Sequence, residues 1–213
     1  MPKLKDIKLK VCGLKHNIQE VVALQPDYVG FIFFPKSPRY VEDLTPEDVQ
    51  TIPDSIKKIG VFVNEELDKV LDLVKQFQLD IVQLHGYESV EYCAKLKEHD
   101  ITIIKVFSGN NELDWMEFKV YEEVVDYFLF DTRTDQFGGT GHSFDWSRLE
   151  KVHLSKPVFL SGGINLDNVE QVSDIKNVNI HAIDVNSKFE VSPGLKNIEL
   201  LKQLKDKILC DTV

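Results

Sequence analysis

Six short apolar segments of this chain end in polar or small residues that could take part in chemistry. In chain order, the segment ends read Cys12-Gly13, Ser37-Pro38-Arg39, Gln83-Leu84-His85-Gly86, Asp131-Thr132, Ser161-Gly162-Gly163-Ile164 and Asp184-Val185-Asn186-Ser187. Thiols and carboxylates transfer protons, arginine binds carboxylates, and loops of small residues expose backbone N–H groups to anions. Together these ends favour proton transfer on a small anionic compound.

Two successive segment ends have the composition of phosphate-binding loops. Ser161-Gly162-Gly163 follows one apolar run, and Asn186-Ser187 follows the next. A nearby helix start would add the positive end of its dipole. A Gly-Gly pair alone could simply permit a tight turn, but two such loops in succession favour a phosphate site.

Cys12 has two interpretations, an inert buried thiol or a general base or nucleophile. Alternation along a strand places Lys8, Lys10 and Cys12 on one face. If that face points inward, the Lys10 charge lies close to the thiol and favours its thiolate form. Cys93 and Cys210 fall within helical patterns, and we interpret both as structural.

Asp131 ends the apolar run Tyr127–Phe130, where partial desolvation would raise its pKa toward that of a general acid. A helix-capping or loop carboxylate is the alternative. The glycine-rich stretch Gln136–His142 follows, and it is either a mobile lid or a tolerant insertion. We interpret His142 as an ordinary loop histidine.

Arg39 and His85 also have two interpretations each. Arg39, between Pro38 and Tyr40, is either a bidentate partner for a carboxylate or a surface arginine. His85 shares a strand face with Gln83, so it either lines a pocket or caps the end of the strand.

The elements that carry these residues alternate between strand-like and helix-like patterns. Strands are predicted at 8–12, 28–33, 56–63, 80–84, 101–107, 127–131, 157–160 and 180–185. Helices are predicted at 17–24, from Thr45 onward, and at 65–77, 89–97, 115–124, 166–172 and 198–209. Thr45-Pro46 is typical of a helix start, with threonine as N-cap and proline in the first turn.

Eight predicted strands that alternate with helices, without a linker, predict an α/β fold, a single (β/α)8 barrel domain over residues 1–213. An open doubly wound sheet is the alternative, but no G-x-G-x-x-G motif follows the first strand. In a (β/α)8 barrel, active sites lie at the C-terminal ends of the strands, where the polar residues occur.

Composition excludes several classes of protein. The chain has 213 residues, a formal net charge of −10 and 43% hydrophobic residues, so we expect neither a nucleic-acid nor a membrane partner. Its 3 cysteines are widely spaced and form no metal-binding pattern. The N-terminus has no apolar signal segment, and the longest apolar run, Val29–Phe34, is too short for a bilayer. We therefore expect a cytoplasmic protein.

Six motifs, spread from about residue 8 to residue 208, together resemble the phosphoribosylanthranilate isomerase family. They are Lys10–Leu14, Gly30–Phe33 with Pro35–Val41, Val82–Gly86, Phe130–Thr132 with Gly138–Trp146, Leu160–Ile164, and Asp184–Ser187 with Glu190 and Pro193–Lys196. The Ser-Pro-Arg-Tyr-Val and Gly-Gly-Thr-Gly segments are especially characteristic. The resemblance implies a (β/α)8 barrel that catalyses an Amadori rearrangement of a phosphosugar without a cofactor or metal.

The resemblance also implies a role for each matched residue. Asp131 matches the general acid and Cys12 the general base, while Arg39 matches the residue near the anthranilate carboxylate. Four residues match the phosphate loops: Gly162, Gly163, Asn186 and Ser187. We add Gln83, His85 and Asp184 as substrate-binding residues, because they too lie at strand ends.

This chemistry requires unusual pKa values. Asp131 must be protonated while Cys12 is ionised, whereas ordinary values of about 3.9 and 8.5 give the reverse. We therefore expect the site to raise the pKa of Asp131 and to lower that of Cys12, with Lys10 as a cause.

The chain departs from the family where Lys188 replaces a glycine after Ser187. A positive φ would be costly for lysine, so the loop either binds phosphate less well or gains a charge. A different phosphosugar enzyme on the same barrel and an inactive barrel that serves as a binding or scaffold subunit remain as alternatives. We expect a monomer, because no long exposed apolar helix is evident.

Overall fold

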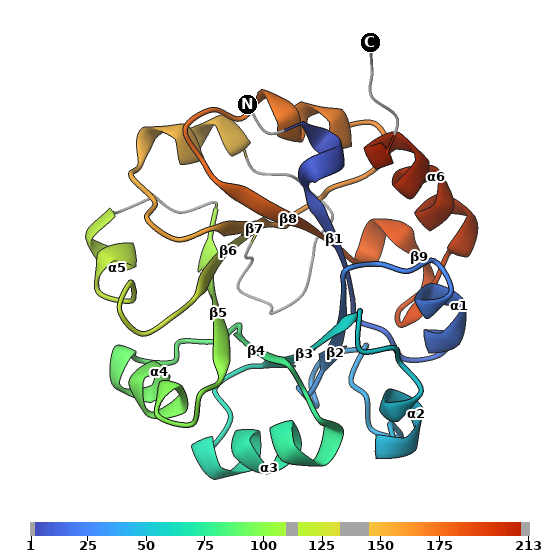
Figure 1. Ribbon diagram of the computed structural model, residues 1–213, viewed down its shortest axis with the longest axis vertical. Helices are drawn as coiled ribbons and strands as arrows, with labels where there is room; N and C mark the ends of the chain where they lie inside the picture. Colours follow the sequence, from blue (N-terminus) through green and yellow to red (C-terminus); the bar gives the residue numbers. More distant parts are fainter. Residues whose placement is uncertain (1–2, 110–114, 133–144, 210–213) are drawn as a thin grey trace.

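Eight parallel strands close into a barrel in the computed structural model, which describes residues 3–109, 115–132 and 145–209 (Figure 1). The strands are β1 (Lys8–Cys12), β2 (Tyr28–Ile32), β3 (Lys57–Phe62), β4 (Ile81–Leu84), β5 (Thr102–Ser108), β6 (Tyr127–Asp131), β7 (Val158–Leu160) and β8 (Ile180–Val185). The predicted (β/α)8 barrel is confirmed. The open-sheet alternative is wrong, because β1 pairs with both β2 and β8.

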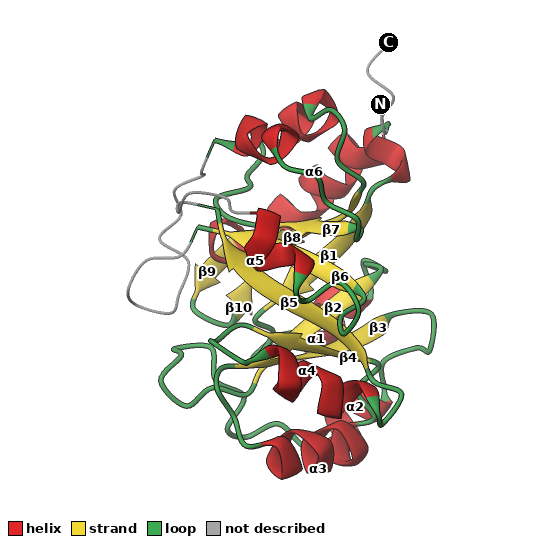
Figure 2. Cartoon of the chain, turned by 90° about the vertical axis from the view of Figure 1, so that its left-hand side faces the viewer, coloured by secondary structure: helices red, strands yellow, loops and turns green. Residues whose placement is uncertain are grey.

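Helices surround the barrel, and Figure 2 shows them flanking the tilted strands from the side. The α-helices are α1 (Ile18–Val22), α2 (Pro46–Gln50), α3 (Leu67–Phe77), α4 (Val90–Lys97), α5 (Trp115–Lys119) and α6 (Ile198–Leu209). Short 3-10 helices are η1 (Leu4–Asp6), η2 (Trp146–Lys151), η3 (Val169–Asp174) and η4 (Ser187–Phe189). Across the described part of the chain, no helix is both long and apolar enough to cross a bilayer.

The start of α2 follows from its sequence. The Thr45 hydroxyl accepts a hydrogen bond from the Asp48 N–H at 3.3 Å, and the Asp48 carboxylate accepts one from the Thr45 N–H at 3.0 Å. This reciprocal pair satisfies N–H groups that have no partner within the helix. The predicted helix start with Thr45 as N-cap is confirmed.

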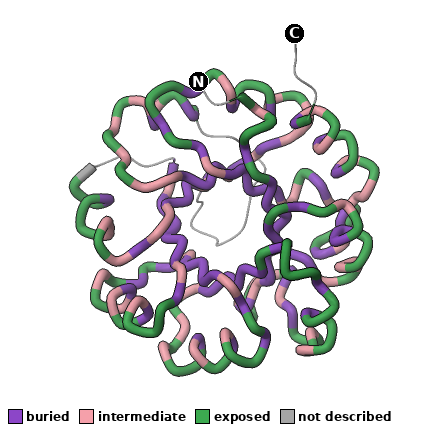
Figure 3. Tube along the Cα trace, viewed as in Figure 1, coloured by how far each residue is buried: buried purple, intermediate pink, exposed green. Residues whose placement is uncertain are grey.

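Alternation along the strands separates two apolar clusters. The smaller cluster lies within the barrel and consists of Tyr28, Ile59, Ile81, Ile104, Val106, Leu129, Phe159 and Ala182. The larger cluster includes strand residues of opposite parity, such as Phe31 and Leu84, together with helix residues. Figure 3 shows the buried strands at the centre of the molecule. Lys10, Gln83 and Asp184 are also buried, so polar groups follow the apolar layer toward the C-terminal strand ends.

The connection after β7 differs from the predicted helix over 166–172. The Asn165 side chain accepts a hydrogen bond from the Asp167 N–H, and the Asn168 side chain accepts one from the Asn165 N–H, both at 2.8 Å. Such local side-chain bonds compete with an α-helical first turn. The segment therefore forms only the 3-10 helix η3.

Two further elements differ from the sequence prediction. The helix expected over 115–124 is shorter, since α5 ends at Lys119, and an unpredicted hairpin of β9 (Glu190–Ser192) and β10 (Leu195–Lys196) follows η4. Cys93 is fully buried in α4, as a structural cysteine would be. Cys210 and the Gln136–His142 stretch lie outside the described residues.

Candidate active site

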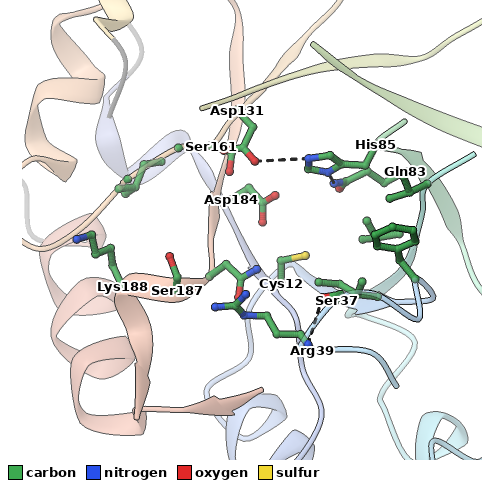
Figure 4. Close-up of a pocket in the computed structure, with 18 residues that line it drawn as sticks. Cys12, Ser37, Arg39, Gln83, His85, Asp131, Ser161, Asp184, Ser187 and Lys188 are labelled. Atoms are coloured by element: carbon green, nitrogen blue, oxygen red, sulfur yellow. Dashed lines mark hydrogen bonds and ion pairs between the residues drawn. The ribbon is translucent and has the colours of Figure 1, made fainter. Parts of the chain in front are cut away.

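A pocket lies at the C-terminal ends of the barrel strands, and Figure 4 shows the side chains that converge on it. The empty space in and above it, which includes solvent at the open mouth, is about 810 Å³. The predicted site residues all line this one pocket: Cys12, Arg39, Gln83, His85, Asp131, Gly162, Gly163, Asp184, Asn186 and Ser187. The barrel topology thus brings together residues from opposite ends of the chain, from Cys12 to Ser187.

Cys12 lies buried at the end of β1, opposite Gly30 of β2. A Cβ atom on Gly30 would stand 2.8 Å from the Cys12 Sγ, so the glycine leaves room for the thiol. Burial raises the pKa of the Cys12 thiol above its ordinary value, although the charges of Lys10 and Lys196 act in the opposite direction. The expectation that Lys10 would bring this pKa below its ordinary value is therefore wrong, because desolvation outweighs the nearby charges.

Asp131 ends β6 and faces the same pocket (Figure 4). Burial, followed by the nearby Asp184 charge, raises the pKa of Asp131 to about 6, while the Thr132 N–H, the Ser161 hydroxyl and Lys10 oppose the rise. A carboxyl group with this pKa is protonated in about a tenth of the molecules at pH 7, far more often than an ordinary carboxyl group. The direction agrees with the expectation for a general acid.

Lys10 is completely buried beneath the pocket and binds two partners. Its Nζ donates to Asp184 Oδ2 at 2.9 Å and to Gln83 Oε1. The second oxygen of Asp184, Oδ1, is buried and has no hydrogen-bond partner among the described residues. Because Asp184 lines the pocket, this oxygen is an acceptor available to a bound molecule.

His85 connects this group to the acid. Its Nδ1 lies 3.2 Å from Gln83 Nε2, and its Nε2 lies 3.6 Å from Asp131 Oδ2. Figure 4 shows the His85 ring directed at the Asp131 carboxylate. His85 therefore lines the pocket, and the alternative of a simple strand cap is wrong.

Arg39 has a protein carboxylate as its bidentate partner. Its Nε donates to Glu190 Oε1 at 2.9 Å, and its Nη2 donates to Glu190 Oε2 at 2.7 Å. Arg39 is 9% exposed, so the alternative of a surface arginine is wrong. A carboxylate in the pocket could meet only the remaining Nη edge of the guanidinium group.

Glu190 also binds Lys196, which extends the network to the strand-eight loop. Lys196 Nζ donates to Glu190 Oε1 and to Asn186 Oδ1, each at 2.7 Å. Asn186 is thereby held between a buried cation and Gly13, where an added Cβ would stand 2.8 Å from Asn186 Oδ1. The sequence motifs included Glu190 and Lys196 but gave neither a role. Their only signal was the presence of charged residues beside small ones.

The loop after β7 has the backbone that its glycines permit. Gly162 has a φ of 86°, Gly163 has a φ of 72°, and a Cβ on Gly162 would stand 2.8 Å from the Thr132 nitrogen. Residues that carry a Cβ atom rarely adopt such φ values, so glycine is required here. The backbone can therefore approach a bound anion closely.

Lys188 lines the pocket from η4, next to Ser187 (Figure 4). The expectation of a costly positive φ at Lys188 is wrong, since its backbone follows the 3-10 helix and does not enter the left-handed region. Lys188 therefore replaces glycine without strain and adds a positive charge beside the small-residue loops.

Among the residues that the structure describes, no group of three or more His, Cys, Asp or Glu side chains could hold a metal ion.

The fold and the pocket define a class of protein: a (β/α)8 barrel with a partly buried carboxyl group, a buried thiol and two loops of small residues at the strand ends. The family model described as N-(5'-phosphoribosyl)anthranilate isomerase matches residues 9–207. The chain belongs to this family, and the alternative of a different phosphosugar enzyme on the same barrel loses its support.

Relatives named N-(5'-phosphoribosyl)anthranilate isomerase cover almost the whole chain. The Parabacteroides distasonis protein is 41% identical over 94% of this chain and 93% of its own length, and the Thermotoga maritima protein is 38% identical over 92% and 95%. The crystal structure of phosphoribosyl anthranilate isomerase from Thermotoga maritima superposes with a TM-score of 0.81 at 37% identity, covering 95% of this chain and 98% of that one. Another solved isomerase, in complex with reduced 1-(o-carboxyphenylamino)-1-deoxyribulose 5-phosphate, has a TM-score of 0.74 at 35% identity over 92% and 95% of the two chains.

Proposed function

We propose that this chain isomerises N-(5'-phosphoribosyl)anthranilate to 1-(2-carboxyphenylamino)-1-deoxyribulose 5-phosphate, the Amadori rearrangement of tryptophan biosynthesis. The observation that carries the proposal is the joint presence of Asp131, Cys12 and the two small-residue loops in one pocket. The reaction needs an acid and a base on a phosphorylated sugar, and this pocket offers both without a cofactor.

Asp131 acts first, as the general acid. It protonates the ribose ring oxygen, the C1–O bond breaks, and the nitrogen lone pair forms a protonated Schiff base at C1. The Cys12 thiolate then removes the C2 proton to give an enaminol. A proton is finally added at C1 and the 2-hydroxyl loses one, so the product is a ketone and both residues regain their starting forms.

The remaining pocket residues bind the substrate. The phosphate lies against the Gly162-Gly163 and Asn186-Ser187 loops, because their backbone N–H groups and the Lys188 charge favour an anion. The anthranilate carboxylate meets Arg39 at the guanidinium edge that Glu190 leaves available.

Gln83, His85 and Asp184 complete the proposed binding site. The unpartnered Oδ1 of Asp184 accepts a hydrogen bond from a sugar hydroxyl, since a buried carboxylate oxygen favours such a donor. Gln83 and His85 also line the pocket and contact each other.

The two pKa values set which form of the enzyme reacts. The productive form has protonated Asp131 and ionised Cys12, although Asp131 has the lower pKa. This form is a minority at every pH, and its population is nearly constant between the two pKa values. The reaction therefore uses a small fraction of enzyme in which a strong acid and a strong base coexist.

The test follows the loss of phosphoribosylanthranilate fluorescence, with the substrate made in situ from anthranilate and phosphoribosyl pyrophosphate. We expect rapid loss with the wild-type protein and a drop of at least about 10³-fold with Asp131→Asn, which cannot donate the proton. Absence of wild-type turnover above spontaneous breakdown would refute the proposal. Cys12→Ser addresses the alternative of an inactive binding barrel, because an enzyme loses its rate whereas a binding subunit keeps its affinity.

We also propose that residues 1–213 form a single domain that acts as a cytoplasmic monomer on a small phosphosugar, without nucleic acid, membrane, metal or cofactor. The one closed barrel and the place of the reaction in amino-acid synthesis support this proposal. A solved Thermotoga maritima structure is that of monomers generated from a dimeric phosphoribosylanthranilate isomerase, so the family includes dimeric members. The mass of this chain in solution, measured by light scattering, tests the monomer.

A further inference from the structure

A series of side-chain contacts runs beneath the pocket from β8 to the acid at the end of β6. It begins at Asp184, whose Oδ2 accepts a hydrogen bond from Lys10 Nζ at 2.9 Å. Lys10 also donates to Gln83 Oε1, and Gln83 Nε2 lies 3.2 Å from His85 Nδ1. The series ends where His85 Nε2 lies 3.6 Å from Asp131 Oδ2.

Lys10 determines the orientation of the Gln83 side-chain amide. An ammonium group has only donors, so the Gln83 atom that faces it must be the carbonyl oxygen Oε1. The amide nitrogen Nε2 must then face His85. Gln83 is 1% exposed and Lys10 is fully buried, so water does not compete for either contact.

The orientation of Gln83 in turn determines where the His85 ring carries its hydrogen. An amide nitrogen only donates, so the facing Nδ1 must accept, which leaves the hydrogen of a neutral ring on Nε2. We propose that Lys10 and Gln83 are positioning residues that fix His85 in the Nε2–H tautomer, directed at Asp131.

This tautomer has a consequence for the acid, and that part of the inference rests on the proposed function. Once Asp131 has given up its proton, the Nε2–H group donates toward the carboxylate, and contacts of this kind often shorten when substrate binds. A hydrogen bond to the charged form stabilises it, so His85 makes Asp131 a stronger acid. Among the residues that the structure describes, two further charged groups act on Asp131: Asp184, which opposes ionisation, and Lys10, which favours it.

The tautomer can be measured directly in the free protein. Ring nitrogens of histidine give distinct ¹⁵N signals in two-bond ¹H–¹⁵N spectra, and the signals that vanish in His85→Gln identify residue 85. We expect a pyrrole-like Nε2 and a pyridine-like Nδ1 in the wild-type protein, and a mixture of tautomers in Gln83→Met. A pyrrole-like Nδ1 in the wild-type protein, or an unaltered spectrum in Gln83→Met, would overturn the proposal.

The effect on Asp131 is measured by ¹³C titration of labelled aspartate carboxyl groups, with Asp131→Asn identifying the signal. We expect His85→Leu and Gln83→Met each to raise the Asp131 pKa by about 0.5 to 1 unit. His85→Gln is the matched control, because its side-chain amide keeps an N–H donor near the Nε2 position, and we expect a smaller shift. Equal titration in His85→Leu and wild type would contradict the inference.

A double variant separates the two positioning steps. If Gln83 acts only through His85, then adding Gln83→Met to His85→Leu should change the Asp131 titration no further. An additional shift of full size would show that Gln83 acts by another route, such as a displaced Lys10 charge. Neither measurement uses turnover, so failure of the inferred tautomer and failure of the proposed isomerase reaction are distinguishable.

Discussion

At the scale of single residues, Glu190 is a buried carboxylate that holds two cations at the edge of the pocket. Its side chain is 4% exposed, and it accepts hydrogen bonds from Arg39, from Lys196 and from the Gly194 N–H. These contacts keep the pKa of Glu190 below its ordinary value although burial alone would raise it. The geometry of Arg39 and of the Asn186 loop therefore depends on one charge.

Removing the Glu190 charge should destabilise the folded protein. In Glu190→Gln, two buried cations lose their shared counter-ion, and we expect a loss of roughly 3–5 kcal/mol in the free energy of unfolding, measured by urea denaturation. Glu170→Gln is the matched control, because its pair with Lys207 is largely exposed, and should cost about 1 kcal/mol or less. Comparable losses in the two variants would show that burial of the Glu190 network is not the cause.

At the scale of elements, the loop after β7 combines a left-handed backbone with contact to the loop after β6. Gly162→Ala would place a Cβ 2.8 Å from the Thr132 nitrogen at a φ of 86°, so the loop must shift away from its present position. We expect inorganic phosphate, tested as a competitive inhibitor, to bind at least about tenfold more weakly, since each lost hydrogen bond to a charged group costs about 1.5–3 kcal/mol.

Gly194→Ala is the control for this variant. Gly194 has a φ of 83° and a similarly close neighbour in Lys15, but it lies in the β9–β10 hairpin turn and does not line the pocket. We expect the same backbone strain with little change in phosphate binding. An equal loss of phosphate affinity in both variants would mean that strain in general, rather than the loop after β7, controls the site.

Some of the strands and helices, and the residues of the pocket, could be predicted from the sequence. Strand β1, strand β6 and helix α6 have the predicted bounds, since each has a clear apolar period and a sharp end. The β9–β10 hairpin was missed because strands of three and two residues are too short to show alternation. The pocket residues were predictable because parallel strands in a barrel bring their C-terminal ends together. The pKa of Cys12 was not, because desolvation depends on packing that the sequence does not state.

At the scale of the whole molecule, cations gather around the pocket of an acidic protein. The chain carries a net charge of −10, yet Lys10, Arg39, Lys188 and Lys196 all lie in or beside the pocket, where they offset the carboxylates of Asp131, Asp184 and Glu190. Because nearby charges act on an anion more strongly than the distant surface does, the pocket repels a phosphate less than the acidic surface as a whole. These buried charges lower the stability of the folded protein by an amount that depends on pH.

The effect of one of these charges, that of Asp131, on stability can be measured. Its folded-state pKa is raised from 3.8 to about 6, so the folded protein prefers the protonated form. The contribution of Asp131 to the free energy of unfolding is therefore highest below its unfolded-state pKa of 3.8. It falls as the pH rises from 3.8 to about 6 and stays low above about pH 6. A shift of this size corresponds to up to about 3 kcal/mol at neutral pH. Asp131→Asn removes the ionisation, so the variant should be inactive but more stable than the wild type at pH 7.5.

Thermal unfolding over a range of pH is the measurement. We expect Tm of Asp131→Asn to exceed that of the wild type by several degrees at pH 7.5. The difference should shrink as pH falls below about 6 and become small near pH 4, where both side chains are neutral. A gain that is independent of pH would assign the stabilisation to packing of the amide instead. No gain in Tm at pH 7.5 would mean that the folded site already compensates the Asp131 charge. Ionisation of Asp131 would then not lower the stability of the folded protein.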